Sequence, residues 1–163
     1  VILAILMITA IPAVTNSIAK SRKDTFATNA KNVINAVRTS MASGDVKNGS
    51  EECSYPADGS AVKITITSDA LKGLLERGGD KSSFGRAYND SYVIIYNKGG
   101  DKFDYYIAIT DKGGNGVATF TKESALTGSN IKLGNAGNIT GTFKPDGSEN
   151  ALATSNISTC TVS

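Results

Sequence analysis

The sequence contains no histidine and no tryptophan, and it has only two cysteines and three prolines. Without imidazole, the chain cannot form a Ser-His-Asp triad, a Cys-His pair, an HExxH zinc site or a histidine-based pH switch. The cysteines, Cys53 and Cys160, are too far apart to form a CxxC redox or zinc motif. Neither a GxSxG motif nor a P-loop occurs. These absences argue against an enzyme, and we expect no catalytic residue and no cofactor.

Charge is also sparse. Only 20% of the residues are charged, and the formal net charge is +2. A nucleic-acid-binding protein normally shows a basic face or tract, which this composition does not indicate. The 163 residues are enough for one compact domain with its own core.

The longest apolar run lies at the start of the chain, where residues 1–14 are apolar apart from Thr9. A helix that spans a bilayer needs roughly 20 apolar residues, so this run is too short as it stands. It fits the apolar centre of a signal peptide, although no basic region precedes it here. It also fits the second half of a longer apolar segment, or the start of a processed chain.

Helical spacing continues beyond this run. Apolar residues follow at intervals of four, three, four and four, and they form one stripe of a helix: Phe26, Ala30, Val33, Val37 and Met41. Gly44 is the predicted stop. The sequence therefore predicts one long helix over residues 1–43, apolar all round over 1–16 and amphipathic over 17–43. We expect the stripe to pack on the remainder of the chain.

The stretch ILAILMITAIPAVTNSIAKSRKDTFATNAKNVINAV resembles the long N-terminal helix of type IV pilins and the related pseudopilins. Members share an apolar stretch, a proline within it, a polar second half and a globular head. Pro12 matches that proline, which implies that Val1 lies inside the mature protein. The leader cleavage site, the methylated first residue and a nearby glutamate would then lie upstream. Ala4 departs from the pattern, because many members have glycine there.

The resemblance implies a structural subunit of an extracellular type IV pilus-like filament at the cell surface. The implied partners are copies of the chain in a helical homopolymer, the inner (cytoplasmic) membrane before assembly, and a host surface or DNA. Adhesion, motility and DNA uptake remain open. The alternative is a minor pseudopilin or a partner-binding module of a type II secretion or competence machine. The implied assembly residues are Val1, Ile2, Leu3, Ile5, Leu6, Ile8, Ile11, Pro12 and Val14.

Basic residues follow the apolar run, at Lys20, Arg22 and Lys23. Basic residues beside a membrane segment favour the cytoplasmic side, whereas pilin heads face away from it. A signal anchor, or a core helix of an ordinary domain, is therefore the alternative interpretation of this region.

Proline also predicts an interruption of the helix. Pro12 lacks the N–H that would bond the carbonyl of Ile8, and its ring clashes with that carbonyl. In pilin filaments the segment around this proline is often stretched out. We therefore expect lost helical hydrogen bonding within Leu6–Val14, with helix resuming by Ser17.

Residues 44–163 predict a globular, β-rich head. The alternation in AVKITIT is typical of a half-buried strand, and SDALKGLLERGG predicts a short helix. Strands over 91–97, 103–110 and 116–122 are expected to form an antiparallel meander that packs against the long helix. The predicted fold class is therefore α+β and pilin-like.

The C-terminal segment, residues 123–163, is rich in Gly, Asn, Ser and Thr and poor in apolar residues. It resembles a flexible tail, but it ends in CTVS, with a cysteine. In an exported protein we expect a Cys53–Cys160 disulfide, whereas a cytosolic protein would keep two buried thiols. Many Gram-negative pilins place both cysteines around a C-terminal loop; this spacing differs, and a Gram-positive type is a candidate.

DKGGNG, from Asp111 to Gly116, partly resembles the start of a calcium-binding loop. Gly113 stands where a second ligand belongs, and no acidic residue follows before Glu123. A β-turn built on Asn-Gly is the favoured interpretation, and Asp111 and Asn115 remain weak metal candidates.

Overall fold

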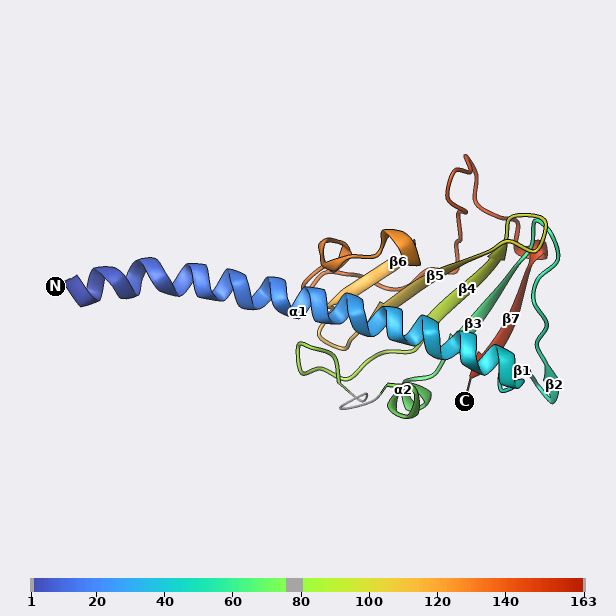
Figure 1. The fold of residues 1–163 in the computed structure, drawn as a ribbon, viewed down its shortest axis with the longest axis horizontal. Helices are drawn as coiled ribbons and strands as arrows, with labels where there is room; N and C mark the ends of the chain where they lie inside the picture. The colour runs from blue at the N-terminus through green and yellow to red at the C-terminus, as the bar shows by residue number, and fades with distance from the viewer. Residues whose placement is uncertain (1, 76–80, 163) are drawn as a thin grey trace.

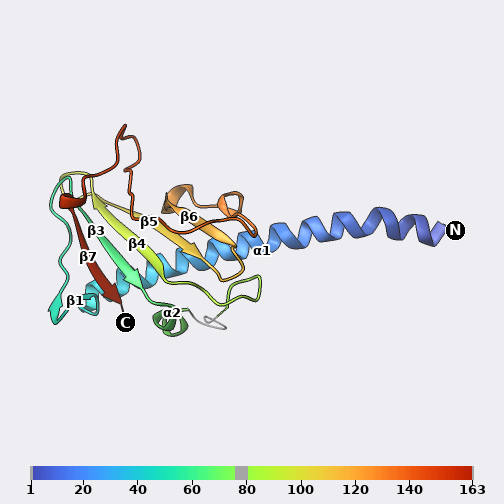
Figure 2. The ribbon, with the colours of Figure 1, turned by 180° about the vertical axis from the view of Figure 1, so that it is seen from behind.

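One long helix lies across a face of a seven-stranded sheet in the computed structural model of this α+β protein (Figures 1 and 2). The structure describes the backbone of residues 2–75 and 81–162, and the side chains of 15–75 and 81–162. The helix extends well beyond the sheet at its N-terminal end, while the C-terminus lies near the opposite end of the helix (Figure 1).

Helix α1 spans Ile2–Ser43 without interruption. The expected loss of helical structure within Leu6–Val14 is therefore wrong for the single chain. Proline removes only one N–H and displaces one carbonyl, so a bend in the helix is sufficient. Unwinding would leave further backbone groups unpaired, at additional cost.

The end of α1 is set by Gly44, as predicted. Gly44 adopts a left-handed conformation with φ 76°. This lets the Asp45 N–H donate to the carbonyl of Ser40 at 2.9 Å, and the Gly44 N–H donates to the carbonyl of Met41 at 3.4 Å. The pair forms a Schellman-type cap, which glycine adopts without the steric cost of a side chain.

The sheet has the strand order β2-β1-β7-β3-β4-β5-β6. Its strands are β1 (Lys47–Asn48), β2 (Glu51–Glu52), β3 (Ala61–Ile66), β4 (Ser91–Asn97), β5 (Phe103–Thr110), β6 (Gly116–Lys122) and β7 (Ile157–Val162). Short helical elements join them: α2 (Ser68–Leu74), η1 (Glu123–Ala125), η2 (Gly128–Asn130) and η3 (Thr154–Asn156). The predicted meander β4–β5–β6 is confirmed at its predicted bounds.

Strand β7 was not predicted. It lies between β1 and β3 and pairs with β3 in parallel, from Ala61↔Ile157 to Ile66↔Val162. Its contact with β1 is limited to the pair Lys47↔Thr161. The C-terminal strand is therefore held almost entirely by β3 on one side, and its other side is nearly free of strand pairing.

The inner face of the sheet carries the main core. The five residues of the α1 stripe are all buried. Four are fully buried, namely Phe26, Ala30, Val33 and Val37, and Met41 is 7% exposed. They belong to one cluster with the inward-facing residues of β3, β4 and β5: Val62, Ile64, Ile66, Val93, Ile95, Ile107 and Ile109. Burial of these apolar side chains fixes the second half of α1 on the sheet.

The outer face carries a second, smaller core, centred on Phe143. Its ring lies 4.7 Å from that of Tyr106, 5.8 Å from Tyr96 and 6.2 Å from Phe120, measured between centroids. Phe143 is 1% exposed. The Asp146 N–H donates to the Tyr106 hydroxyl at 2.9 Å. One aromatic side chain thus pins the polar C-terminal segment across the outer face.

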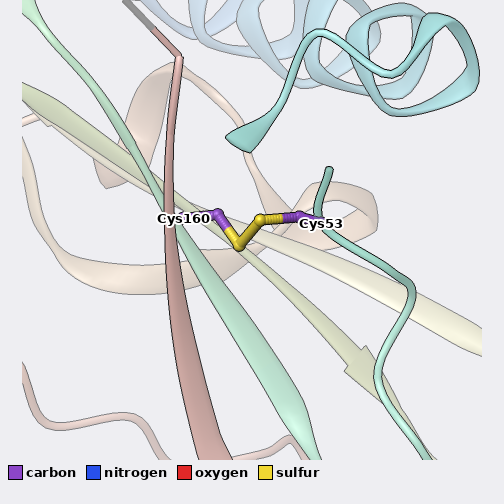
Figure 3. The surroundings of a disulfide bond; sticks show 2 residues. All are labelled: Cys53 and Cys160. Atoms are coloured by element: carbon purple, nitrogen blue, oxygen red, sulfur yellow. A yellow bond between two sulfur atoms is a disulfide. The ribbon is translucent and has the colours of Figure 1, made fainter. Parts of the chain in front are cut away.

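The predicted disulfide is confirmed (Figure 3). Cys53 and Cys160 are bonded, with Cα atoms 6.5 Å apart, inside the distance that a disulfide spans. Cys53 lies just after β2 and Cys160 lies within β7, so the bond ties the C-terminal strand to the connection that follows α1.

We predict that the double substitution Cys53→Ser, Cys160→Ser lowers the free energy of unfolding by about 4–5 kcal/mol in the chain-entropy model. The reason is the sequence separation of 107 residues that the bond closes. Chemical denaturation of the oxidised wild type and the variant measures the difference. An unchanged free energy of unfolding would contradict this role.

Phe143→Ala is expected to cost about 3–5 kcal/mol of stability, as for other buried aromatic residues. It should also expose the segment around it to limited proteolysis, because the described ring contacts to that segment are lost. Leu133→Ala is the matched control, since Leu133 is 40% exposed and belongs to the same C-terminal segment. Equal protease sensitivity of the two variants would show that Phe143 does not hold the segment.

Candidate functional site

The candidate site is the part of α1 that extends beyond the head. From Thr15 to Thr25 the helix side chains are exposed or half-buried. Phe26 is the first buried residue among the helix residues whose side chains the structure describes. Ile18, an aliphatic residue, is 48% exposed. The head therefore covers only the second half of the helix and leaves the first half projecting (Figure 1).

The predicted assembly residues fall in this projecting half. Their side chains, from Val1 to Val14, lie outside the described part of the structure, as does the backbone of Val1. Within residues 15–75 and 81–162, whose side chains the structure describes, no helix has the length and hydropathy needed to cross a bilayer.

An aromatic cluster fixes the helix where it meets the head. The Phe26 ring lies 5.8 Å from the ring of Tyr88 and 6.2 Å from that of Phe84. Burial raises the pKa of Tyr88, and Asn29 Nδ2 donates to its hydroxyl at 3.4 Å. One turn earlier, Ser83 Oγ donates to the carbonyl of Arg22 at 2.7 Å. The loop before β4 thus holds the helix at its exit from the head.

A second contact fixes the helix further along. Arg38 Nη2 donates to Glu123 Oε1 at 2.9 Å, and Arg38 Nη1 lies 2.8 Å from Oε2. The guanidinium also lies over the Tyr105 ring, 4.2 Å from its centroid. The hydrogen bond with Glu123 raises the pKa of Arg38, and burial raises that of Tyr105. Because both members of the ion pair are partly exposed, it orients α1 on β5 and η1 more than it stabilises the fold.

The calcium candidate forms a closed structural turn. Asp111 is 1% exposed, and its carboxylate accepts hydrogen bonds from the backbone N–H groups of Gly113 and Asn115, from Asn115 Nδ2 and from Ser82 Oγ. Asn115 Oδ1 accepts in turn from the Gly134 N–H. In the described parts of the chain, no three acidic, histidine or cysteine side chains form a metal-binding group. Asp111 and Asn115 therefore organise the β5–β6 connection.

Several residues of these contacts were absent from the sequence-based predictions. Glu123 is 85 positions from Arg38, and nothing in the sequence pairs them. Ser83, Phe84 and Tyr88 lie in a loop with no periodic pattern. Only the tertiary structure brings these residues to the helix.

Comparisons of the chain with protein-family models, with curated proteins and with solved structures found no match. Its function must therefore be argued from its own residues and geometry.

We predict that Asp111→Asn destabilises the head by about 1–3 kcal/mol. The substitution replaces one carboxylate oxygen, which accepts hydrogen bonds, by an NH2 group that cannot accept them, so a buried donor loses its partner. Asp58→Asn is the control, since Asp58 is exposed. Calcium or a chelator should leave the melting temperature of the wild type unchanged. A rise in melting temperature with calcium that Asp111→Asn abolishes would instead establish a metal site.

Proposed function

We propose that this protein is a structural subunit of an extracellular type IV pilus-like filament, and not an enzyme. Before assembly it is anchored in the cytoplasmic membrane by its N-terminal segment. In the filament, the apolar helices of neighbouring copies pack together at the centre and the heads face outward at the cell surface. The filament serves adhesion, motility or DNA uptake.

The observation that carries this proposal is the division of α1 into two halves. The second half is part of the head's core, whereas the first half projects from it. The sequence of the projecting half begins with the apolar residues 1–14. An apolar helix that its own head does not cover is strongly driven to bury its surface elsewhere, at roughly 25 cal/mol per Å².

Repetition of one such contact produces a fibre. Each copy would present its projecting helix to a different surface of the next copy, and a heterologous contact of this kind does not close on itself. The contacts at Phe26 and Arg38 support this arrangement, because they fix the helix rigidly on its head and so transmit one orientation along the filament.

Negative-stain electron microscopy of the purified native material tests the proposal. Long regular fibres are expected. Short tips or single particles bound to secretion or competence components would favour the alternative, a minor pseudopilin. If the material forms neither fibres nor such assemblies, the result contradicts membership of this class.

Ile8→Asp is expected to abolish fibre formation and leave the melting temperature of the head within a few degrees of the wild type. A carboxylate in an apolar helix bundle is costly to bury, whereas the head's core begins at Phe26. Asn32→Asp is the matched control, because it adds the same charge to an exposed position of α1. Fibre counts by electron microscopy and thermal unfolding by circular dichroism provide the two readouts.

Normal fibres from Ile8→Asp would show that the projecting half does not form the fibre's core. Loss of fibres in both variants would attribute the effect to charge on the helix in general.

A further inference from the structure

Basic residues gather where α1 leaves the head. Three lie on the helix and three lie on loops of the head, and we call these six residues the basic collar: Lys20, Arg22, Lys23, Arg86, Lys112 and Lys132. All are exposed except Lys23, which is half-buried. The sequence showed only the three helical members, and the filament proposal does not use them.

Backbone contacts place the head's members at the end of the head from which the helix emerges. The loop that contains Arg86 reaches α1 through the hydrogen bond from Ser83 Oγ to the Arg22 carbonyl. Arg86 lies against the β5–β6 connection, since a Cβ atom on Gly113 would lie 3.0 Å from Arg86 Cγ. In the same connection, the Lys112 N–H donates to the Ala87 carbonyl at 2.8 Å.

Lys132 reaches this end of the head by a different route. Its backbone pairs in both directions with Gly116, at the start of β6. The preceding element, η2, contacts α1. Figures 1 and 2 both show the loop before β4 and the β5–β6 connection at the end of the head from which the helix emerges.

The collar's charge is not neutralised within the described structure. The ion pairs there use the basic residues Arg38, Lys72, Lys98 and Lys122, none of which belongs to the collar. Asp24 is the single acidic residue of the sequence between positions 15 and 43. Asp111 lies nearby and is buried, and Asp90 lines a groove together with Lys112. Three carboxylates thus oppose the six basic side chains of the collar. This end of the head therefore presents a net positive surface.

The collar's distance from the apolar run matches the level of lipid headgroups. Lys20 and Lys23 follow Val14 by six and nine residues, roughly 9–14 Å along a helix at 1.5 Å per residue. Helical Cα–Cβ bonds tilt toward the N-terminus, so these long side chains lean back toward the apolar run. Lysine and arginine side chains readily extend in this way to reach a polar layer.

A groove at this place suits a headgroup. It has a volume of about 440 Å³ and lies between α1 and the segment around η2. Lys20 and Lys23 line it together with one carboxylate, that of Asp24, and with Leu133, which is 40% exposed. Ammonium groups beside an exposed aliphatic side chain match a lipid phosphate beside its glycerol and upper acyl chain.

We propose that the basic collar binds anionic phospholipid headgroups on the outer face of the membrane that anchors the subunit. This inference rests on the proposed function for the anchoring itself. The headgroups hold the base of the head against the membrane until the subunit joins a filament. The same contact accounts for basic residues on the side of the apolar run that the positive-inside tendency disfavours.

Vesicle binding by the full-length chain tests the collar. The probes are phosphatidylcholine vesicles with and without phosphatidylglycerol, compared by co-sedimentation at low and high salt. The wild type should bind the anionic vesicles more tightly, and added salt should reduce the difference. Each basic residue near an anionic surface strengthens binding roughly fivefold. The ratio of binding to anionic over neutral vesicles should therefore fall by at least about tenfold in K20E/K23E.

The matched control is K47E/K102E, which makes the same charge change at exposed positions of β1 and the β4–β5 turn. It should keep the wild-type preference. Circular dichroism melting verifies that both variants are folded, as expected for substitutions of exposed or half-buried side chains.

The proposal is overturned if the wild type shows no anionic preference, if K20E/K23E keeps it, or if the control loses it equally. It is also overturned if K20E/K23E keeps the preference but stops fibre growth, because the collar would then contact the next copy. Anionic binding by a chain that forms no fibres would reject the filament function and leave the lipid contact established.

Discussion

Packing of the Phe26–Met41 stripe on the inner face of the sheet is the constraint on which the rest of the structure depends. A helix of 42 residues cannot be covered by a head of this size along its whole length. Because the stripe occupies only the second half, the sheet forms beneath that half and the first half is left projecting. The shape of the molecule, a compact head on an extended helix, follows from where the apolar stripe begins.

Much of this arrangement could be predicted from periodicity. A helical repeat identified the stripe, a two-residue repeat identified β3, and Gly44 marked the helix end; these signals are local and need no tertiary information. The meander was predictable for the same reason, since glycine-rich turns separate its β-branched and aromatic runs. The interruption at Pro12 was predicted wrongly, because the resemblance on which it rested concerns packed filaments and the structure shows a single chain.

What the sequence concealed was the C-terminal segment. Strand β7 is rich in serine and threonine, and its place beside β3 depends on a parallel pairing between distant segments. Phe143 is one aromatic residue in a polar stretch, and its importance lies in Tyr96, Tyr106 and Phe120 on other elements. Of the candidate site, the helical residues could be predicted, whereas the contacts that orient the helix and the head's share of the basic collar required the tertiary structure.

The central claim is that the first half of α1 is an assembly arm independent of its head. The chain has no tryptophan, so Ile8→Trp introduces a single fluorescent reporter, with Thr28→Trp as a control at an exposed position of the same helix. We predict blue-shifted emission and protection from acrylamide for Trp at position 8 in assembled material, and an exposed reporter at position 8 in any unassembled, lipid-free chain. Protection at position 8 before assembly, or exposure within the fibre, would contradict the account.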